Sequence, residues 1–271
     1  MSVRTEPRLL TTAELALAQW RNSCGLWRRQ CAEPEAKGVF ELHEASPYLV
    51  ILATDSSALP NLARVEQAAS PDIEAFAAMY QVVDSAPGQA ALSLRLHPTA
   101  DVAEWREFLI NLGFQPSTTR QVAMGRSLAD VRPAAETDLD VMRVEPDDDA
   151  RMEQALEANG EAFGSPPSHR QFFLNPRTVD VYLALFQGTP AGSATAAYVD
   201  KTVGVYGVAT RPGFRGRGVA SALVARILEG AAERAQVAIL DCQHELVSLY
   251  QRSGFEVARE MPTYLLLGSR R

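Results

Sequence analysis

One short segment constrains this chain more than any other. Residues 208–221 read V-A-T-R-P-G-F-R-G-R-G-V-A-S and lie between a run of β-forming residues and an amphipathic helix. Three glycines let the backbone turn tightly and approach a ligand, so that successive N–H groups can converge on an anion. The helix adds the positive end of its dipole, and Arg215 and Arg217 add mobile positive charge. The segment predicts a site for two linked phosphates, whereas the structural alternative is a glycine-rich turn with solvated arginines.

Length and composition describe an ordinary globular protein with room for two domains. The chain has 271 residues, 46% hydrophobic and 22% charged, and domains usually contain about 100 to 200 residues. Its net charge of −7 argues against nucleic-acid binding, because such affinity comes largely from basic side chains that neutralise phosphates. No stretch approaches the roughly 18 consecutive apolar residues of a membrane span. Residues 1–10 contain too short an apolar run for a signal peptide. We expect a cytoplasmic location, no membrane contact and no nucleic-acid partner.

The residues that could bind metal or form disulfides are few and scattered. The cysteines are odd in number and lack the paired spacing of a zinc site, so we expect reduced, packed thiols. The histidines are too dispersed to suggest a cluster, and no metal is expected. These residues are Cys24, Cys31 and Cys242, and His43, His97, His169 and His244.

Hydrophobic patterning predicts a mixed α and β arrangement after a linker at 127–140. A strand at 141–144 precedes a helix that starts at the Asp147-Asp148-Asp149 cap and runs to Phe163. Three β runs joined by tight turns read as an antiparallel meander. From Val219 to Ala231, apolar residues recur at the spacing of one helical face. The meander strands are expected at 179–186, 191–199 and 203–210, followed after the helix by a strand at 237–240, a short helix at 245–252 that Gly254 ends, and strands at 255–258 and 264–267.

The first half contains a fainter copy of this ending. A strand at 91–96, a helix at 102–112, the pair Gly113-Phe114 and a further strand repeat the order of elements around Gly254-Phe255. We interpret the repeat as an internal duplication. The copy has no glycine–arginine loop, since the residues before its expected helix near Ile73 read E-Q-A-A-S-P-D. The tryptophans of this half are expected in the core or between the halves, and they are Trp20, Trp27 and Trp105.

Two motifs resemble those of a known enzyme family. The segment R-G-R-G-V-A at 215–220 resembles the R-x-x-G-x-G/A acetyl-CoA signature of the GNAT superfamily of N-acetyltransferases. Downstream, L-Y-Q-R-S-G-F at 249–255 resembles the family's L-Y-x-x-x-G-F ending, and Pro212 stands where members usually carry proline. The resemblance covers roughly residues 141–267. It implies two GNAT-like halves of α/β (α+β type) fold, each with a mixed, mostly antiparallel sheet flanked by helices.

The resemblance also implies a domain layout and a set of cofactor-binding residues. Residues 1–130 would form a degenerate GNAT-like domain without a cofactor loop, and residues 140–271 the catalytic domain. Backbone amides of the loop and helix start would receive the CoA pyrophosphate, with two arginines near its phosphates and strand groups along the pantetheine arm. Gln243 stands where many relatives carry an asparagine that touches the cofactor. The implied cofactor-binding residues are Val208, Ala209, Thr210, Arg215, Gly216, Arg217, Gly218, Val219, Ala220, Ser221 and Gln243.

The implied activity is acetyl transfer from acetyl-CoA to a primary amine of a small molecule or peptide, by direct attack in a ternary complex and without metal. An amide near Val208 would polarise the thioester carbonyl, and Tyr250 would protonate the leaving thiolate. The acidic chain suits a cationic amine such as an aminoglycoside, polyamine, amino acid or peptide N-terminus, although net charge does not report the charge of a cleft. The oligomeric state is open, with a homodimer as one candidate.

Alternatives to this function stay open. Residues 216–221 also approximate the dinucleotide-binding G-x-G-x-x-G, with Asp241 near the place of a ribose-binding acid. Against that interpretation, Ser221 replaces the third glycine and a meander precedes the loop. The chain could instead be a non-catalytic acyl-CoA sensor or interaction module, because Gly204 stands where relatives often carry a glutamate base.

The catalytic residues have alternatives as well. Tyr250 could be a core aromatic on a short helix. A water chain or an acid such as Glu161 could remove the amine proton. His244 lies near Tyr250 in sequence, although a surface position is expected for it. A covalent intermediate on Cys242 is disfavoured, since nothing in its sequence neighbourhood pairs it with a base.

Overall fold

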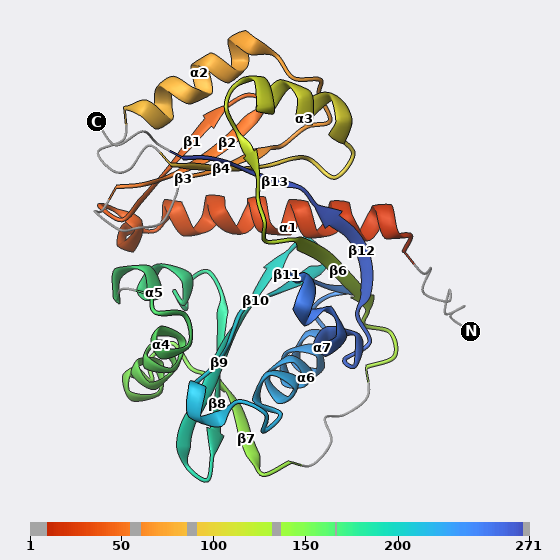
Figure 1. The fold of residues 1–271 in the computed structure, drawn as a ribbon. Coiled ribbons are helices and arrows are strands. Elements are labelled where there is room, and N and C mark those ends of the chain that lie inside the picture. Colours follow the sequence, from red (N-terminus) through yellow and green to blue (C-terminus); the bar gives the residue numbers. More distant parts are fainter. Residues whose placement is uncertain (1–9, 55–60, 86–90, 132–136, 166, 268–271) are drawn as a thin grey trace, which may run out of the picture.

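The computed structural model describes residues 10–54, 61–85, 91–131, 137–165 and 167–267. Two β-sheets, each covered by helices, lie on either side of one long helix, α1 (Thr12–Ala32), as Figure 1 shows. The start of α1 is set by a capping box, in which Thr11 and Glu14 satisfy each other's backbone N–H groups. The predicted linker at 127–140 lies partly outside the described residues.

The first sheet has six strands in the order β1-β2-β3-β4-β13-β5 within the described residues. Strands β1 to β3 pair antiparallel, β3 pairs parallel with β4, and α2 and α3 cover one face (Figure 1). Tyr48 and Trp105 lie in the core between this sheet and its helices. The elements are the 3-10 helix η1 (Pro34–Ala36), β1 (Phe40–Ala45), β2 (Tyr48–Ala53), β3 (Asn61–Val65), α2 (Ile73–Asp84), β4 (Leu92–Arg95), α3 (Val102–Asn111) and β5 (Gln115–Pro116).

The second sheet has seven strands in the order β12-β6-β11-β10-β9-β8-β7 within the described residues. The predicted meander is confirmed, because β8, β9 and β10 pair antiparallel, and β10 then pairs parallel with β11. Its elements are β6 (Gln121–Ser127), β7 (Leu139–Val144), α4 (Asp149–Phe163), α5 (Pro167–Phe173), β8 (Asp180–Phe186), β9 (Thr189–Val199), β10 (Thr202–Thr210), η2 (Pro212–Phe214), α6 (Val219–Ala231), β11 (Val237–Gln243), η3 (His244–Leu246), α7 (Val247–Gln251) and β12 (Glu256–Met261), with β13 (Thr263–Leu266) in the first sheet.

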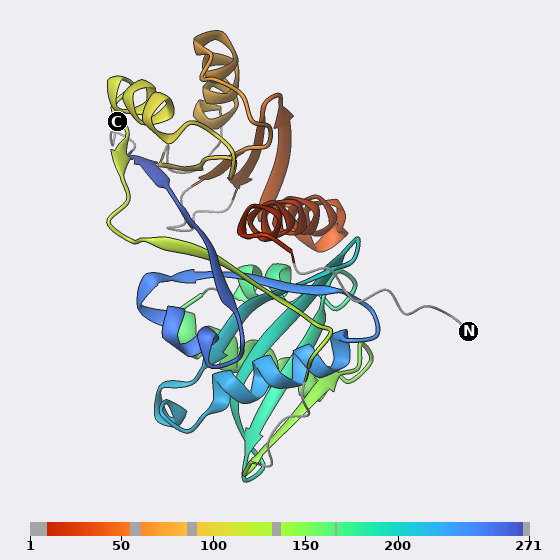
Figure 2. The same ribbon diagram turned by 90° about the vertical axis from the view of Figure 1, so that its right-hand side faces the viewer.

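Helix α6 confirms the predicted apolar face. Leu223, Val224, Ile227 and Leu228 are buried against the second sheet, whereas Arg226 is exposed. Helices α6 and α7 cover one face of this sheet, and α1, α4 and α5 lie on the other (Figures 1 and 2). The fold is therefore the predicted mixed α and β class, with two mostly antiparallel sheets. Helix α5 was not expected from the sequence.

The two sheets exchange one strand each. Strand β6 from the first half lies between β11 and β12, and β13 from the end of the chain lies between β4 and β5. Figure 2 shows these two segments crossing between the layers beside α1, which is seen end-on. The sequence repeat did not predict this exchange. The strand expected at 264–267 is β13, which belongs to the first sheet and not to the second. The domain boundaries at 130 and 140 stay a prediction, and each half borrows a strand from the other.

The Gly-Phe repeat has the same geometry in both halves. Gly113 and Gly254 have φ of 88° and 80°, the left-handed conformation that ends a helix. The next N–H bonds back to the helix in each case, from Phe114 to Leu109 and from Phe255 to the carbonyl of Tyr250. Leu109 in α3 and Tyr250 in α7 therefore occupy corresponding places.

Candidate active site

The glycine–arginine loop ends at a helix start that no side chain caps. Strand β10 leads through η2 into α6, whose N-cap is Gly218 with φ of 80°, and Gly216 has φ of 78°. No acidic residue lies in the first turn of α6. The first N–H groups of a helix lack partners within the helix and carry a partial positive charge. The loop therefore offers an open anion site.

The predicted loop residues differ in how they can contribute to that site. Arg215 to Gly218 are exposed, whereas Val219 is buried and offers only its backbone, and Ala220 and Ser221 are half-buried. The guanidinium of Arg217 lies over the ring of Phe186, 4.8 Å from its centroid. Beside the loop, a hollow of about 1040 Å³ runs from Gly218 and Ser221 along α6, and the arginines in its lining are Arg126, Arg226 and Arg252.

The two parallel strands next to the loop separate. Strands β10 and β11 pair only from Thr202 with Val237 to Gly204 with Ile239, although both continue further. The register of β10 against β9 shifts between Tyr206 and Ala209, and Gly207 within this bulge has φ of 57°. Backbone groups of β10 beyond this point therefore face β11 without a strand partner. The predicted residues Val208, Ala209 and Thr210 lie in this stretch.

Tyr250 lies close to the end of β11. Its side chain is buried, and its ring contacts Phe255 edge-on at 6.2 Å between centroids. Burial raises the pKa of the phenol to about 12, with Cys242 and Asp241 adding to the shift. Gln243 and His244 are exposed at the β11 terminus. The phenol therefore keeps its proton at neutral pH.

A cavity of about 530 Å³ lies between the two halves, on the α1 face of the second sheet. Gly207 and Tyr206 at the β10 bulge and Asp241 on β11 line it from one side. The first half lines it with Arg64 on β3 and with residues of α1 and β4. The cavity thus reaches both separated strands from the face opposite α6. The remaining lining residues are Ser23, Leu26, Trp27, Gln30, Leu62, Ala63, Ser93, Arg95, Asn159, Phe163, Ser165, Phe173, Leu174 and Thr195.

Asp241 links the halves inside this cavity. Its carboxylate accepts hydrogen bonds from Arg95 Nη1 at 2.9 Å and from Gln19 Nε2 at 3.1 Å. Burial by itself would raise the pKa of Asp241, but Arg95 and Arg64 outweigh it and the pKa lies below its usual range. Asp241 is therefore a stable anion. The structure does not favour a dinucleotide site here, because two side chains of the first half already occupy the carboxylate that would bind the ribose.

Gly204 has no room for a glutamate or any other side chain. A Cβ at this position would lie 2.3 Å from the Tyr206 ring and 2.4 Å from Asn22 Oδ1. Tyr206 Oη donates a hydrogen bond of 2.8 Å to the same Asn22 oxygen, and Asn22 Nδ2 donates to the backbone oxygen of Ala197. A side chain of α1 therefore fills the space in front of this glycine.

The other base and nucleophile candidates lie in unsuitable surroundings. Both carboxylate oxygens of Glu161 accept hydrogen bonds of 2.7 Å from Arg211, and this residue does not line the cavity. Burial raises the pKa of the Cys242 thiol to about 11, so little thiolate forms at neutral pH.

No group of three or more potential metal ligands occurs within the described part of the chain. No helix there is long and apolar enough to cross a membrane.

Sequence reasoning missed the residues that the first half contributes. Trp20 and Trp105 are buried, and Trp27 is half-buried in a cluster that joins the two halves, all as expected. Trp27 also lines the cavity, which was not expected. Arg64 lies within the otherwise mostly apolar strand Asn61–Val65. A charged residue inside such a run is the signal that could have marked it.

Comparison with known proteins agrees with the architecture. Residues 148–255 match the Acetyltransferase (GNAT) family. A GCN5-related N-acetyltransferase from Kribbella flavida has a TM-score of 0.67 at 19% identity, over 97% of this chain and 98% of that one. Another from Sphaerobacter thermophilus has a TM-score of 0.59 at 18% identity, over 96% and 94%. A tandem GNAT protein from the clavulanic acid biosynthesis pathway has a TM-score of 0.59 at 14% identity, over 97% and 98%.

No significant match was found among curated proteins. The identities to the solved structures are low, so these likenesses show the fold alone. Fold, loop and family match together define an acyltransferase. Within that class, the family that residues 148–255 match is the acetyltransferase (GNAT) family.

Proposed function

We propose that the protein is an acetyl-CoA-dependent N-acetyltransferase whose second half holds the cosubstrate and whose acceptor amine enters through the cavity between the halves. One observation carries the proposal. The open N-terminus of α6 and the cavity lie on opposite faces of the second sheet, at the point where β10 and β11 separate. An acyl donor and an amine can then meet between the two strands.

The residues present fit coenzyme A in shape and charge. The uncapped first turn of α6, residues 218–221, matches a diphosphate, because its N–H groups have no side-chain acceptor of their own. The unpaired edge of β10 from Val208 to Thr210 can bond the amide groups of an extended arm. The hollow beside the loop is lined by three arginines, Arg126, Arg226 and Arg252, and by Asp130 and Asp140, and its arginines can pair with phosphates at the nucleotide end.

Bound acetyl-CoA supplies a thioester, whose carbonyl carbon is the electrophile. The N–H of Val208 at the β10 bulge would donate to the carbonyl oxygen as negative charge develops there. The cavity would hold the amine for direct attack, and no covalent enzyme intermediate is needed. Tyr250 would donate its phenolic proton to the leaving sulfur. Its raised pKa suits this role, since the acid must be protonated when the C–S bond breaks.

The acceptor must lose a proton, and among the lining residues that the structure describes only Asp241 provides a carboxylate. Its lowered pKa makes it a weak base but a permanent anion. Because Arg95 already pairs with this carboxylate, we assign removal of the amine proton to water in the cavity.

A transfer assay separates this function from an acyl-CoA sensor. The protein is incubated with labelled acetyl-CoA and a panel of primary amines, and acetylated product is measured. We expect transfer, with Tyr250→Phe lowering kcat by roughly 100-fold or more at unchanged acetyl-CoA affinity. Tyr48→Phe is the matched control, because this phenol is buried in the first half and its hydroxyl has no hydrogen-bond partner among the residues that the structure describes. Binding of acetyl-CoA without transfer to any amine would contradict the enzyme and favour the sensor.

A further inference from the structure

We propose that the guanidinium of Arg64 binds a carboxylate of the acceptor, so that the acceptor is an amino-carboxylate with an apolar side chain. This inference rests on the proposed function, since it concerns the same cavity. It narrows the acceptor from any primary amine to a class in which an amino acid is the simplest member.

Arg64 is a buried cation without a carboxylate partner. Its side chain is 4% exposed, and its guanidinium lies over the rings of Trp27 and Trp20, at 4.1 Å and 5.0 Å from their centroids. Its Nη1 donates to the hydroxyl of Ser23, while its Nε is buried with no hydrogen-bond partner. No carboxylate forms an ion pair with Arg64 in the part of the chain that the structure describes.

Such a charge is costly unless a ligand compensates it. An arginine keeps its charge in proteins, and an unpaired buried ion loses hydration without a matching attraction. Two aromatic rings stabilise a cation only partly. Because Arg64 lines the cavity, an anion there can reach the guanidinium that the protein itself leaves unpaired.

The charge balance of the cavity selects a monoanion. The charged residues in its lining are Arg64, Arg95 and Asp241. Asp241 pairs with Arg95 at 2.9 Å and also interacts electrostatically with Arg64, so the three side chains together carry one net positive charge. A carboxylate matches that charge, whereas a phosphate dianion would leave one negative charge uncompensated in a place of low dielectric constant.

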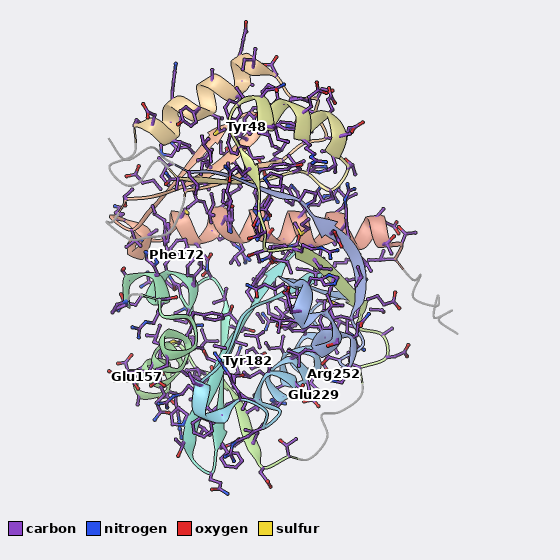
Figure 3. All side chains as sticks on the ribbon, in the orientation of Figure 1. Tyr48, Glu157, Phe172, Tyr182, Glu229 and Arg252 are labelled. Atoms are coloured by element: carbon purple, nitrogen blue, oxygen red, sulfur yellow. The ribbon has the colours of Figure 1, made fainter. Side chains whose placement is uncertain are left out.

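The rest of the lining suits an apolar side chain. Phe163 and Phe173 line the same cavity from α4 and α5, yet they are 56% and 39% exposed. Ligand pockets are lined mainly by apolar and aromatic side chains, which contact the apolar part of the ligand. Phe172, which points from α5 toward the first half in Figure 3, packs on Phe40 at 4.5 Å between ring centroids and fixes α5 against that half. An acceptor can thus place its amine near Gly207, its carboxylate at Arg64 and its side chain against the aromatic rings.

The first test uses the wild-type protein alone. Acetyl transfer is compared between L-phenylalanine and 2-phenylethylamine, which differ in the carboxylate, with rates corrected for the fraction of neutral amine. We expect kcat/KM to be at least about tenfold higher for the carboxylate-bearing member, because only this member can form charged hydrogen bonds with the buried guanidinium of Arg64. Equal or reversed preference, with transfer intact, would overturn the inference and leave the proposed function standing.

The second test measures binding without reaction. Calorimetry with 3-phenylpropionate, which has the carboxylate but no amine, should show binding that Arg64→Met weakens by about tenfold or more. Arg143→Met is the matched control, because this arginine lies exposed on β7 and pairs with Glu145. Tighter binding of phenyl phosphate than of 3-phenylpropionate, or equal binding by wild type and a folded Arg64→Met, would overturn the carboxylate assignment. Should Arg64→Met fail to fold, the wild-type amine pair decides. If the wild-type protein does not bind acetyl-CoA at all, the proposed function itself is overturned.

Discussion

The two halves of this molecule share one order of elements but differ at the start of a single helix. In each half a three-stranded meander leads through a helix to a parallel strand, and a short helix and a Gly-Phe pair follow. At α2, the carboxylate of Asp72 accepts from the N–H of Ala75 at 2.7 Å, and Glu74 adds a second acid to the first turn. At α6, Gly218 leaves the same position open. The first half therefore keeps the same order of elements although Asp72 occupies the helix start that could otherwise bind an anion.

The second difference is at the short helix. Leu109 of α3 is fully buried in the first core, in the place where α7 carries Tyr250. A leucine there serves packing alone, whereas a phenol can also move a proton. The first half instead contributes Arg64 and Arg95 to the cavity wall. One copy thus carries the features that we propose for cosubstrate binding, and the other lines the proposed acceptor cavity.

The largest expected effect comes from giving α6 the acid that α2 already has. Ser221→Glu places a carboxylate in the first turn of α6, where it interacts well with the helix dipole but repels a diphosphate. We expect acetyl-CoA affinity to fall by roughly 100-fold or more, since like charges brought together cost several kcal/mol, while Tm stays equal or rises. Calorimetry and thermal unfolding measure the two quantities. Ser221→Gln, of equal size and no charge, should bind nearly as wild type; an equal loss in both variants would mean that bulk alone blocks the site.

A smaller effect, on stability, is expected from a substitution at Gly204, where Asn22 of α1 packs against β10. Gly204→Ala should lower the free energy of unfolding by about 1–3 kcal/mol, because the new methyl group meets Tyr206 and Asn22. Chemical denaturation measures the change. Adding Asn22→Ala should recover part of it, whereas a stable Gly204→Ala protein would show that the space is free.

The pH dependence of transfer sharpens the role of Tyr250. Since burial raises the pKa of this phenol to about 12, the acid is protonated at all lower pH values and loses its proton only as pH rises through that value. We therefore expect kcat/KM to rise with deprotonation of the amine and to show no alkaline fall below about pH 10. A descending limb between pH 7 and 9 that disappears in Tyr250→Phe would contradict the assignment.

The smallest expected effect is that of Cys242→Ala. Because the thiol pKa is raised to about 11, no thiolate pathway should operate at neutral pH, and kcat should change by less than about threefold. A loss of more than about 100-fold, with acetyl-CoA binding intact, would indicate a covalent step on this cysteine.

The sequence predicted the features of the fold that depend on neighbouring residues, namely helix faces, helix caps and helix ends. The apolar spacing in α6, the acidic cap of α4 at Asp148 and the left-handed Gly254 all follow from the sequence, because each depends on a few adjacent residues. The exchange of β6 and β13 does not, since both strands have ordinary β patterns and only the packing of the sheets selects their neighbours.

The same limit applies to the candidate site. The loop from Arg215 to Ser221 carries its chemistry in its own backbone, so its sequence reveals it. The cavity wall depends on Arg64, Arg95 and Asp241, which are far apart along the chain and meet only in the folded protein. Apart from the charge of Arg64 within a mostly apolar strand, their proposed role in acceptor binding has no local signature.

The most direct test of the central claim is the stoichiometry of acetyl-CoA binding by calorimetry on the folded wild-type chain. Only one of the two related helix starts is open, so one molecule should bind per chain. Two molecules per chain would mean that the first half also holds the cosubstrate, and no binding would mean that the helix start of α6 is not a diphosphate site.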